Sequence, residues 1–254
     1  MKRKSTKAQP VIVEKRLGIP GDYQFSAISS KNPLQAHWHQ NKLAAISHCL
    51  KLNKNSVVLD LGAGSGNFEL HFGTQLKKII SADYNDESIA FLKSQLRQRG
   101  ISSVQTLQVN ITDTAKLKKL RNLDAIIMID VIEHIERGAM LQTAKAFHEM
   151  LKPGGQVCII TPNYGSIWPL IEKTSDALHL LPQFDGEQHI SKFTAASLRE
   201  FFQKTKLRLV AERSFNLFSF LAPSSALSKK LCLFELDHLG TAGSLLLSVF
   251  EKRK

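Results

Sequence analysis

Apolar runs alternate with helix-like stretches from residue 56 to residue 161, and this alternation restricts the fold more than any other feature. The runs are short and rich in Val, Ile and Leu, and each leads through a turn into a segment with helical spacing of its apolar residues. Strands covered on both faces have this composition, so the pattern predicts a parallel sheet in an α/β fold. We expect strands at Val57–Leu61, Lys78–Asp83, Val104–Val109, Ala125–Asp130 and Gln156–Thr161.

Helices are expected between these strands, and one more is expected before them, at Asn41–Leu50, Phe68–Leu76, Asp86–Gln98, Ala115–Leu120 and Gly138–Leu151. Beyond residue 161 the alternation weakens. A helix at Thr194–Lys204 and two strands, Leu207–Phe215 and Ser244–Phe250, are separated by long inserts at 163–193 and 216–242. The two strands are expected to be antiparallel neighbours, and the first insert is a candidate lid or substrate loop.

The net charge of +12 comes from the two ends of the chain. Residues 1–55 carry ten Lys and Arg against two Asp and Glu, and residues 201–254 carry nine against four, whereas residues 56–200 carry fifteen against sixteen. Bulk charge therefore does not attract a partner to the centre. We expect a basic N-terminal arm over residues 1–40 and one folded domain, with both inserts, over residues 41–254.

Several classes of protein are excluded. The three cysteines are widely spaced and form no C-x-x-C pair, which predicts neither a disulfide framework nor a zinc site. Glu14, Lys15 and Arg16 stand where a signal peptide needs an apolar region. No run approaches the roughly 18 to 20 apolar residues of a membrane span. These patterns predict a cytoplasmic protein.

A glycine-rich turn follows the first expected strand, with Gly62, Gly64 and Gly66 two residues apart and Asp60 two residues before them. Glycines let the backbone pass close beneath a ligand while amide N–H groups point at it. The spacing is not the G-x-G-x-x-G of dinucleotide-binding proteins. A carboxylate at Asp60 would repel a pyrophosphate, but it suits a ligand that carries an ammonium and a sulfonium group.

The second expected strand ends in another acid. Asp83 lies 17 residues after Gly66, where a carboxylate at a strand tip can accept both hydroxyls of a ribose. Tyr84 beside it can cover one face of an adenine. The glycine turn and the two strand-end acids together predict a site for a nucleoside-containing cofactor.

These features resemble the class I S-adenosylmethionine-dependent methyltransferases over about residues 40–251. The glycine segment is similar to the first motif of that family, and Asp83 to its ribose-binding acid. Ala125–Asp130 is similar to its fourth-strand motif, and residues 151–155 (Leu-Lys-Pro-Gly-Gly) to its turn before strand five. The resemblance implies a Rossmann-like seven-stranded sheet in the order 3-2-1-4-5-7-6, with strand seven antiparallel and helices on both faces.

The resemblance also implies S-adenosylmethionine as the cofactor. Its binding residues would be Asp60, Gly62, Ala63, Gly64, Gly66, Asp83, Tyr84, Asn110, Ile111 and Asp130. Asn110 departs from the family, which commonly holds the adenine amine through an acid at that place. An Asn carbonyl oxygen can still accept the amine N–H, whereas the alternative is a turn-forming residue.

The segment Asp130-Val131-Ile132-Glu133-His134-Ile135 is similar to the D-V-x-E-H-x of small-molecule O- and C-methyltransferases, including those of ubiquinone biosynthesis. It follows the fourth strand, at the sheet edge where open α/β sheets bind ligands. His189 precedes Phe193-Thr194 in a His-x-x-x-Phe-Thr segment that also occurs in that group. Glu133, His134 and His189 are therefore the candidate catalytic residues.

Either imidazole would serve as the general base for a hydroxyl acceptor, because imidazole titrates near neutral pH. A helix-start acid and structural histidines remain the alternative. Upstream, Trp38 and its flanking histidines are expected to close the cofactor pocket or to pack in the core. His37 and His39 also form a His-x-His pair, but no further ligands are identifiable, so no metal site is predicted.

The predicted function is methyl transfer from S-adenosylmethionine to a small-molecule or lipid-like acceptor, by O- or C-methylation. Apolar residues in both inserts, beside Lys229 and Lys230, also predict a peripheral contact with an anionic membrane; lid packing is the alternative. A nucleic-acid methyltransferase that uses the basic flanks is the alternative function. The chain lacks the Asn/Asp-Pro-Pro-Tyr/Phe segment of amino-methyltransferases that act on bases. A non-catalytic cofactor-binding module is a third reading, and the oligomeric state stays open.

Overall fold

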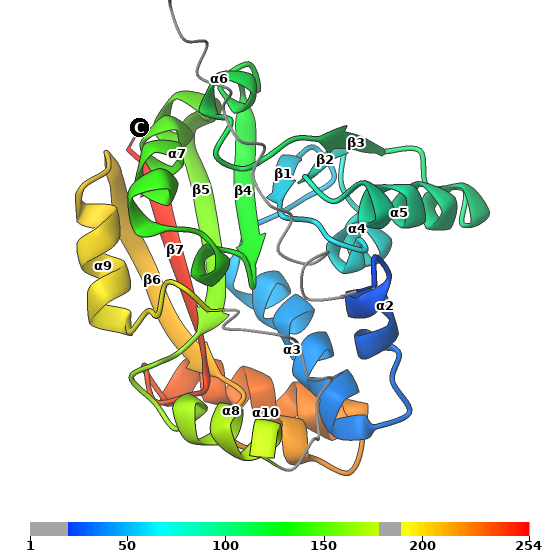
Figure 1. Cartoon of the computed structure of the whole chain (residues 1–254), viewed down its shortest axis with the longest axis vertical. Helices are drawn as coiled ribbons and strands as arrows, with labels where there is room; N and C mark the ends of the chain where they lie inside the picture. The colour runs from blue at the N-terminus through cyan, green and yellow to red at the C-terminus, as the bar shows by residue number, and fades with distance from the viewer. Residues whose placement is uncertain (1–19, 178–188, 254) are drawn as a thin grey trace, which may run out of the picture.

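The computed structural model describes residues 20–177 and 189–253, and its centre is a seven-stranded sheet (Figure 1). The strand order is β3-β2-β1-β4-β5-β7-β6. Neighbouring strands from β3 to β5 pair in parallel, whereas β7 is antiparallel to both β5 and β6. The predicted α/β class, strand order and antiparallel seventh strand are confirmed.

The strands lie close to the predicted positions: β1 Val57–Leu61, β2 Lys78–Asp83, β3 Val104–Gln108, β4 Leu123–Ile129, β5 Leu151–Pro162, β6 Leu207–Phe215 and β7 Leu245–Lys252. β1, β2 and β6 agree with the prediction to the residue. β5 begins five residues earlier than predicted, because Leu151 already pairs with Leu123 across a register shift. The Pro-Gly-Gly turn therefore forms an irregular first part of the strand.

The helices are α2 Tyr23–Ile28, α3 Pro33–Cys49, α4 Asn67–Phe72, α5 Asp86–Gln98, α6 Thr114–Leu117, α7 Arg137–Met150, α8 Trp168–Ala177, α9 Ala195–Gln203 and α10 Ser225–His238. Two short 3-10 turns, η1 Ile132–His134 and η2 Ser219–Leu221, complete the described part. α4 is shorter than predicted and ends before Gly73. A Cβ on that glycine would lie 2.6 Å from the carbonyl oxygen of Glu69, so the backbone is closely packed there.

α3 begins eight residues before its predicted start, so the arm boundary expected at residue 40 falls inside this helix. Asn32 caps the helix by accepting a hydrogen bond from Leu34 N–H at 3.0 Å, and Pro33 occupies the first position, where a missing N–H costs nothing. Residues 20–40 thus belong to the folded domain. Residues 1–19 lie outside the described part of the chain.

Two apolar cores lie on opposite faces of the sheet, because neighbouring residues of a strand point to opposite sides. On one face, Leu59 packs with residues of α7 and α9, such as Phe147 and Phe202. On the other face, Val58 packs with residues of α3, α4 and α10, such as Ile46. The central strands are covered on both sides, as their composition predicts.

The second insert is held together internally by a buried carboxylate. Glu235 of α10 accepts hydrogen bonds from the N–H groups of Phe218 and Ser219, both at 2.8 Å, and from Ser219 Oγ at 2.7 Å. The first insert contains α8, and its residues 178–188, with the predicted apolar Leu178, Leu180 and Leu181, lie outside the described residues. Within 20–177 and 189–253, no helix combines the length and the apolar character needed to cross a membrane.

Candidate functional site

The glycine turn after β1 adopts a backbone that side chains would obstruct. Gly62, Gly64 and Gly66 have φ angles of 90°, 52° and 87°. A Cβ on Gly62 would lie 2.4 Å from Cγ2 of Val131, and one on Gly64 would lie 2.3 Å from Oε1 of Gln24. Ala63 within the turn is buried. The turn therefore needs its glycines both for conformation and for space.

Asp83, at the end of β2, is tied to this turn. Its Oδ2 accepts the N–H of Gly64 at 2.8 Å, and its Oδ1 accepts the N–H of Asn85 at 2.8 Å. Burial raises the pKa of Asp83, and these two N–H groups oppose that effect. Tyr84 follows directly and is partly buried. The acid and the glycine turn thus form one unit at the carboxyl edge of the sheet.

Asp60 lies beneath the turn next to a second acid. Burial, together with the nearby carboxyl of Glu69, raises the pKa of Asp60 well above its usual range. Burial likewise raises the pKa of Glu69 to about 7. Within the described structure, Oδ1 of Asp60 has no hydrogen-bond partner. An ammonium group brought to this place would gain a buried acceptor, which fits the amino group of the expected cofactor.

A narrow cavity adjoins Asp60 and Gly62 and extends to Lys42 of α3 and to Asp130, which follows β4. The Lys42 ammonium forms an ion pair with the Asp130 carboxylate. Burial acts to raise the pKa of Asp130, but the ammonium outweighs it and holds this pKa below its usual value. Lys42 is itself buried, so its ion pair with Asp130 is shielded from solvent.

α2 packs against the glycine turn. Phe25 N–H donates to Ser65 Oγ at 2.7 Å, and the side-chain amide of Asn67 donates to the carbonyl oxygen of Gln24 at 2.9 Å. The cavity beneath has a volume of about 30 Å³, which is room for one or two water molecules. A ligand the size of a nucleoside is larger than this cavity, so we expect it to displace the Gln24 side chain, which lines the cavity.

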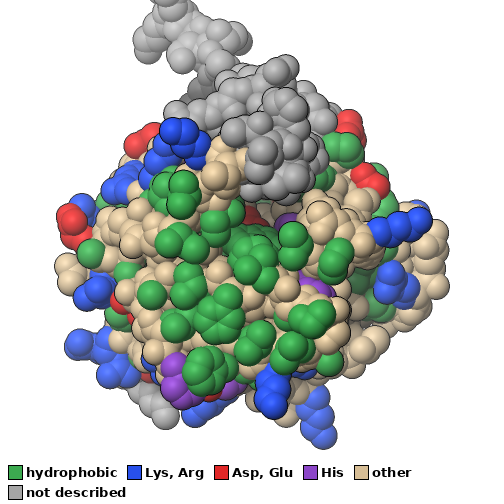
Figure 2. Space-filling model, turned by 90° about the horizontal axis from the view of Figure 1, so that it is seen from below, with side chains coloured by type: hydrophobic (Ala, Val, Ile, Leu, Met, Phe, Trp, Pro, Cys, Tyr) green, Lys and Arg blue, Asp and Glu red, His purple; other side chains and the backbone are tan. Residues whose placement is uncertain are grey.

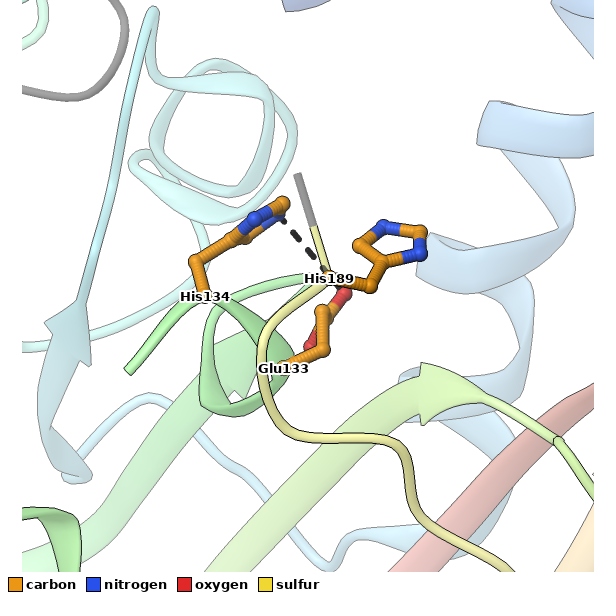
Figure 3. A group of neighbouring side chains, drawn as sticks. All are labelled: Glu133, His134 and His189. Atoms are coloured by element: carbon orange, nitrogen blue, oxygen red, sulfur yellow. Dashed lines mark ion pairs between the residues drawn. The ribbon is translucent and has the colours of Figure 1, made fainter. Parts of the chain in front are cut away.

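The three predicted catalytic residues lie close to one another (Figure 3). Glu133 and His134 come from η1, and His189 comes from the segment before α9. Each offers one ligand atom, and these atoms lie within 4.8 Å of one another. Oε1 of Glu133 is 4.0 Å from Nε2 of His134, while its Oε2 accepts a hydrogen bond from Thr161 Oγ1 at 2.9 Å.

The ring of His189 is held by two contacts at Nδ1. Its Nδ1 lies 2.8 Å from Oε1 of Glu172 and 2.7 Å from the hydroxyl of Tyr164. Burial acts to lower the pKa of His189, but the hydrogen bond to Glu172 and the charge of Glu133 outweigh it, so the pKa is raised. For Glu133, burial raises the pKa, and His134 opposes that effect. The ring of His189 is thus oriented by its contacts at Nδ1.

Comparison with known proteins decides the family. Residues 35–212, more than half of the chain, match the sequence model of a family described as "Methyltransferase domain". The chain belongs to this methyltransferase family. With the observed strand order, this confirms the predicted class I S-adenosylmethionine-dependent group. The cofactor of that class supplies a methyl group activated by a sulfonium.

Two similar curated proteins are named as methyltransferases. The methyltransferase is 24% identical over 140 residues to the ubiquinone biosynthesis O-methyltransferase of Pseudomonas syringae pv. tomato, over 55% of each chain. It is 22% identical over 143 residues to a probable cobalt-precorrin-6B C(15)-methyltransferase (decarboxylating) of Methanothermobacter thermautotrophicus, over 56% of this chain and 68% of that protein. The match therefore spans about half the length of the first relative and two thirds of the second.

Two solved structures share the fold. N-methyltransferase NodS from Bradyrhizobium japonicum WM9, in complex with S-adenosyl-L-homocysteine, is 15% identical with a TM-score of 0.58, over 95% of this chain and 97% of that one. The putative methyltransferase in a complex with the Haloferax volcanii Trm112 activator is 14% identical with a TM-score of 0.64, over 95% and 98%. At these low sequence identities, the similarity shows a shared fold and nothing more.

Asn110 behaves as a turn residue in the methyltransferase. Its Oδ1 accepts hydrogen bonds from Thr112 N at 2.9 Å and from Thr112 Oγ1 at 2.7 Å. Both lone pairs of the carbonyl oxygen are therefore used, which favours the turn-forming alternative over the adenine contact. Ile111 is buried in the apolar core, and its carbonyl oxygen accepts from Thr143 Oγ1. The adenine contact remains a prediction for these two residues.

The His-x-His pair does not act as one unit. His37 is bonded to the carbonyl oxygen of Phe220 and to Ser225 Oγ, whereas His39 lines the cavity, and burial together with Lys42 lowers its pKa to about 3. In the described ranges, the pair belongs to no group of potential metal ligands; Glu133, His134 and His189 form such a group.

Sequence reasoning missed Lys42, which lines the cavity, and Glu69, which lies next to Asp60. Each is a charged residue within the apolar pattern of a helix at the sheet edge, and this pattern is the signal that could have identified them.

Proposed function

We propose that this methyltransferase transfers a methyl group to a hydroxyl oxygen of a small, lipid-like acceptor. The juxtaposition of His189 with Glu133 beside the cavity that holds Asp60, Lys42 and Asp130 carries this proposal. A base placed between a cofactor site and open surface is what deprotonation of a hydroxyl needs. The similarity to a ubiquinone biosynthesis O-methyltransferase supports this acceptor chemistry, and methylation of a carbon activated by the same oxygen is the nearest variant.

Each of these residues would have one role, which its position determines. Asp60 would hold the amino group of S-adenosylmethionine and Lys42 its carboxylate, while Asp83 would hold the ribose. Nε2 of His189 would accept the proton of the acceptor hydroxyl, because Glu172 orients the ring through Nδ1. The protein's remaining task is to align the acceptor oxygen with the methyl group and to exclude water.

An aromatic path supports a lipid-like acceptor. The ring centroids of His189 and Trp168 are 6.4 Å apart, those of Trp168 and Trp38 are 5.3 Å apart, and those of Trp38 and Phe220 are 5.1 Å apart. The path leads from His189 to Phe220 of η2. An acceptor with an apolar tail would bury it along these rings.

The path ends near an apolar surface. Figure 2 shows hydrophobic side chains gathered across the face that carries α8 and α10, with Lys and Arg at its margin. Large exposed apolar residues of these elements and of η2 include Leu170, Leu221, Leu227 and Phe234. We propose that this face contacts an anionic membrane from which the acceptor is taken, with Lys229 and Lys230 adding electrostatic attraction.

The test uses methyl-tritiated S-adenosylmethionine and extracts of the native host, separated into lipid, aqueous small-molecule and RNA fractions. Label is expected in the lipid or small-molecule fraction, and none with Asp60→Ala, Asp83→Ala or Gly64→Val. Label in RNA would overturn the proposal in favour of the nucleic-acid alternative. Retained cofactor binding in all three variants would refute the assignment of the cofactor site.

Co-sedimentation with vesicles tests the membrane contact separately. Binding to vesicles that contain phosphatidylserine, weakened by high salt and by Leu221→Asp, is expected because charge and apolar burial both contribute. Equal recovery with and without anionic lipid would refute the contact and leave the enzymatic proposal intact.

A further inference from the structure

We propose that Glu133, His134 and His189 bind a divalent transition-metal cation of the Zn²⁺ or Mn²⁺ type. The group offers one carboxylate oxygen and two imidazole nitrogens within 4.8 Å of one another (Figure 3). Two imidazoles and a carboxylate are a common ligand set for such cations, and three protein ligands leave coordination positions open for a substrate. The metal site stands on geometry, and only its catalytic use rests on the proposed function.

Glu133 presents an oxygen that needs a partner. Its side chain is fully buried, and Thr161 Oγ1 donates to Oε2 at 2.9 Å, which fixes the plane of the carboxylate. Oε1 has no hydrogen-bond partner in the parts of the chain that are described. A buried carboxylate oxygen without a donor is unfavourable, and a cation supplies the missing interaction.

His189 has the support that metal-bound histidines usually have. Glu172 accepts from Nδ1 at 2.8 Å, and the Tyr164 hydroxyl lies 2.7 Å from the same nitrogen. These contacts occupy Nδ1 and set the orientation of the ring, so Nε2 would be the nitrogen that binds the cation. A carboxylate on the far nitrogen of a metal-bound histidine fixes the ring and increases its basicity.

Closing the site needs only small movements. Metal–ligand bonds of roughly 2.0–2.2 Å place the ligand atoms about 3.0–3.6 Å apart. Oε1 of Glu133 and Nε2 of His134 are now 4.0 Å apart, and the widest pair in the group is within 4.8 Å. The His134 side chain is 34% exposed, so the movement of its ring toward the other two ligands takes place at the surface and not in the core.

The position suits activation of an acceptor hydroxyl. Glu133 follows Asp130 by three residues, and Asp130 lines the cofactor cavity, so the cation would lie between that cavity and the acceptor path. A hydroxyl coordinated to the cation releases its proton to water more readily. Its oxygen then forms the bond to the methyl carbon as the carbon–sulfur bond breaks, and the electron pair stays on sulfur. The sulfonium becomes a neutral thioether, and no external oxidant or reductant takes part. With the cation bound, His189 would be a ligand and water would take the proton; the base role proposed above for His189 applies to the enzyme without the cation.

The test is a Co²⁺ titration of the full chain, stripped with chelator and freed of any histidine tag, followed by visible absorption. Co²⁺ is expected to bind at one ion per chain and to be displaced by Zn²⁺. Glu133→Gln, His134→Gln and His189→Gln are each expected to weaken binding at least 100-fold. Glu172→Gln, which changes the support of His189 and leaves all three ligands in place, should weaken it about 10- to 100-fold.

His148→Gln on α7 is the matched control and should bind Co²⁺ as the unchanged protein does. The thermal unfolding of each variant shows whether it is folded, and the half-exposed His134 gives the variant least able to disturb the fold. Binding that does not saturate near one ion per chain, or that is equal in Glu133→Gln and His148→Gln, would overturn the proposal.

Binding of S-adenosylhomocysteine and methyl transfer to the labelled fraction, measured in parallel, separate this proposal from the proposed function. Transfer that falls on chelation and returns with Co²⁺ or Zn²⁺ supports the catalytic use of the cation. Transfer that is unaffected by chelation overturns that use and leaves the enzymatic proposal intact. Absence of any transfer together with stoichiometric Co²⁺ binding overturns the proposed function and leaves the metal site.

Discussion

Alanine at three glycines separates the backbone requirement of the cofactor turn from its spatial requirement. Gly64, Gly66 and Gly100 have φ angles of 52°, 87° and 65°. An L-residue in the left-handed region costs about 1–2 kcal/mol at each position. A Cβ on Gly100 meets no atom within 4 Å, so Gly100→Ala measures this backbone cost alone and serves as the control.

At the two turn positions, a Cβ would also contact different neighbouring atoms, which changes the total loss of stability. A Cβ on Gly66 would lie 2.2 Å from Cδ1 of the fully buried Leu92, and overpacking a core costs about 1–3 kcal/mol more. Gly66→Ala should therefore lose about 2–5 kcal/mol. A Cβ on Gly64 instead meets Oε1 of Gln24, which is the end of a flexible side chain. Gly64→Ala should lose no more stability than Gly100→Ala.

Cofactor binding should distinguish Gly64→Ala from Gly100→Ala. The Cβ of Gly64→Ala projects toward Gln24, into the space that a nucleoside must take, so affinity for S-adenosylhomocysteine should fall at least tenfold, about 1.4 kcal/mol. Gly100→Ala should bind normally. Urea unfolding gives the free energies and calorimetric titration gives the affinities. Equal stability of Gly66→Ala and Gly100→Ala, or full affinity in Gly64→Ala, would refute the reasoning.

Three further predictions concern single charged or aromatic side chains. Lys42→Met should weaken S-adenosylhomocysteine binding tenfold or more in a titration but leave 5′-methylthioadenosine, which has no carboxylate, nearly unchanged; equal losses would contradict the assigned contact. Because burial raises the pKa of Glu69 to about 7, its folded state binds a proton more tightly than the unfolded state does, and this stability is lost as pH rises from about 4.5 through 7. Glu69→Gln should therefore be more stable than the unchanged protein in urea unfolding at pH 8 and lose that advantage at pH 5; an advantage equal at both pH values would count against the buried acid. Trp168→Ala should raise the KM for an acceptor with an apolar tail while cofactor affinity stays constant, and a matching loss of cofactor affinity would show instead that the aromatic path supports the cofactor site.

The elements that sequence analysis placed best are those whose signals are local. β1, β2, β6 and α5 agree to the residue because an apolar run or a helical stripe is bounded by turn residues within a few positions. The glycine turn was equally accessible, since its glycines and the neighbouring acid are contiguous in the sequence. The start of α3 was missed although Pro33 and Asn32 marked it, because the apolar stripe used to place the helix begins later.

These local patterns could not predict contacts between distant segments of the chain. Lys42 and Asp130 are 88 residues apart, and their ion pair depends on how α3 packs across the end of β4. His189 lies in a segment that no repeat or spacing relates to Glu133, and only the fold brings them together. Glu172, which orients His189, comes from α8 in an insert whose internal structure the sequence did not specify.

The turn after β4 joins the cofactor side of the molecule to the acceptor side. Asp130 has a φ of 53°, a region that Asp enters at less cost than most residues, and its N–H donates to the carbonyl oxygen of Ile160 at 3.0 Å. That conformation lets Asp130 face Lys42 at the cavity while Glu133 faces the two histidines. One short segment thus fixes the distance between the residues around the cofactor cavity and the group that would activate the acceptor. A change that relaxes this turn should therefore impair methyl transfer more than it impairs the binding of either ligand, because alignment of the two reacting groups depends on it.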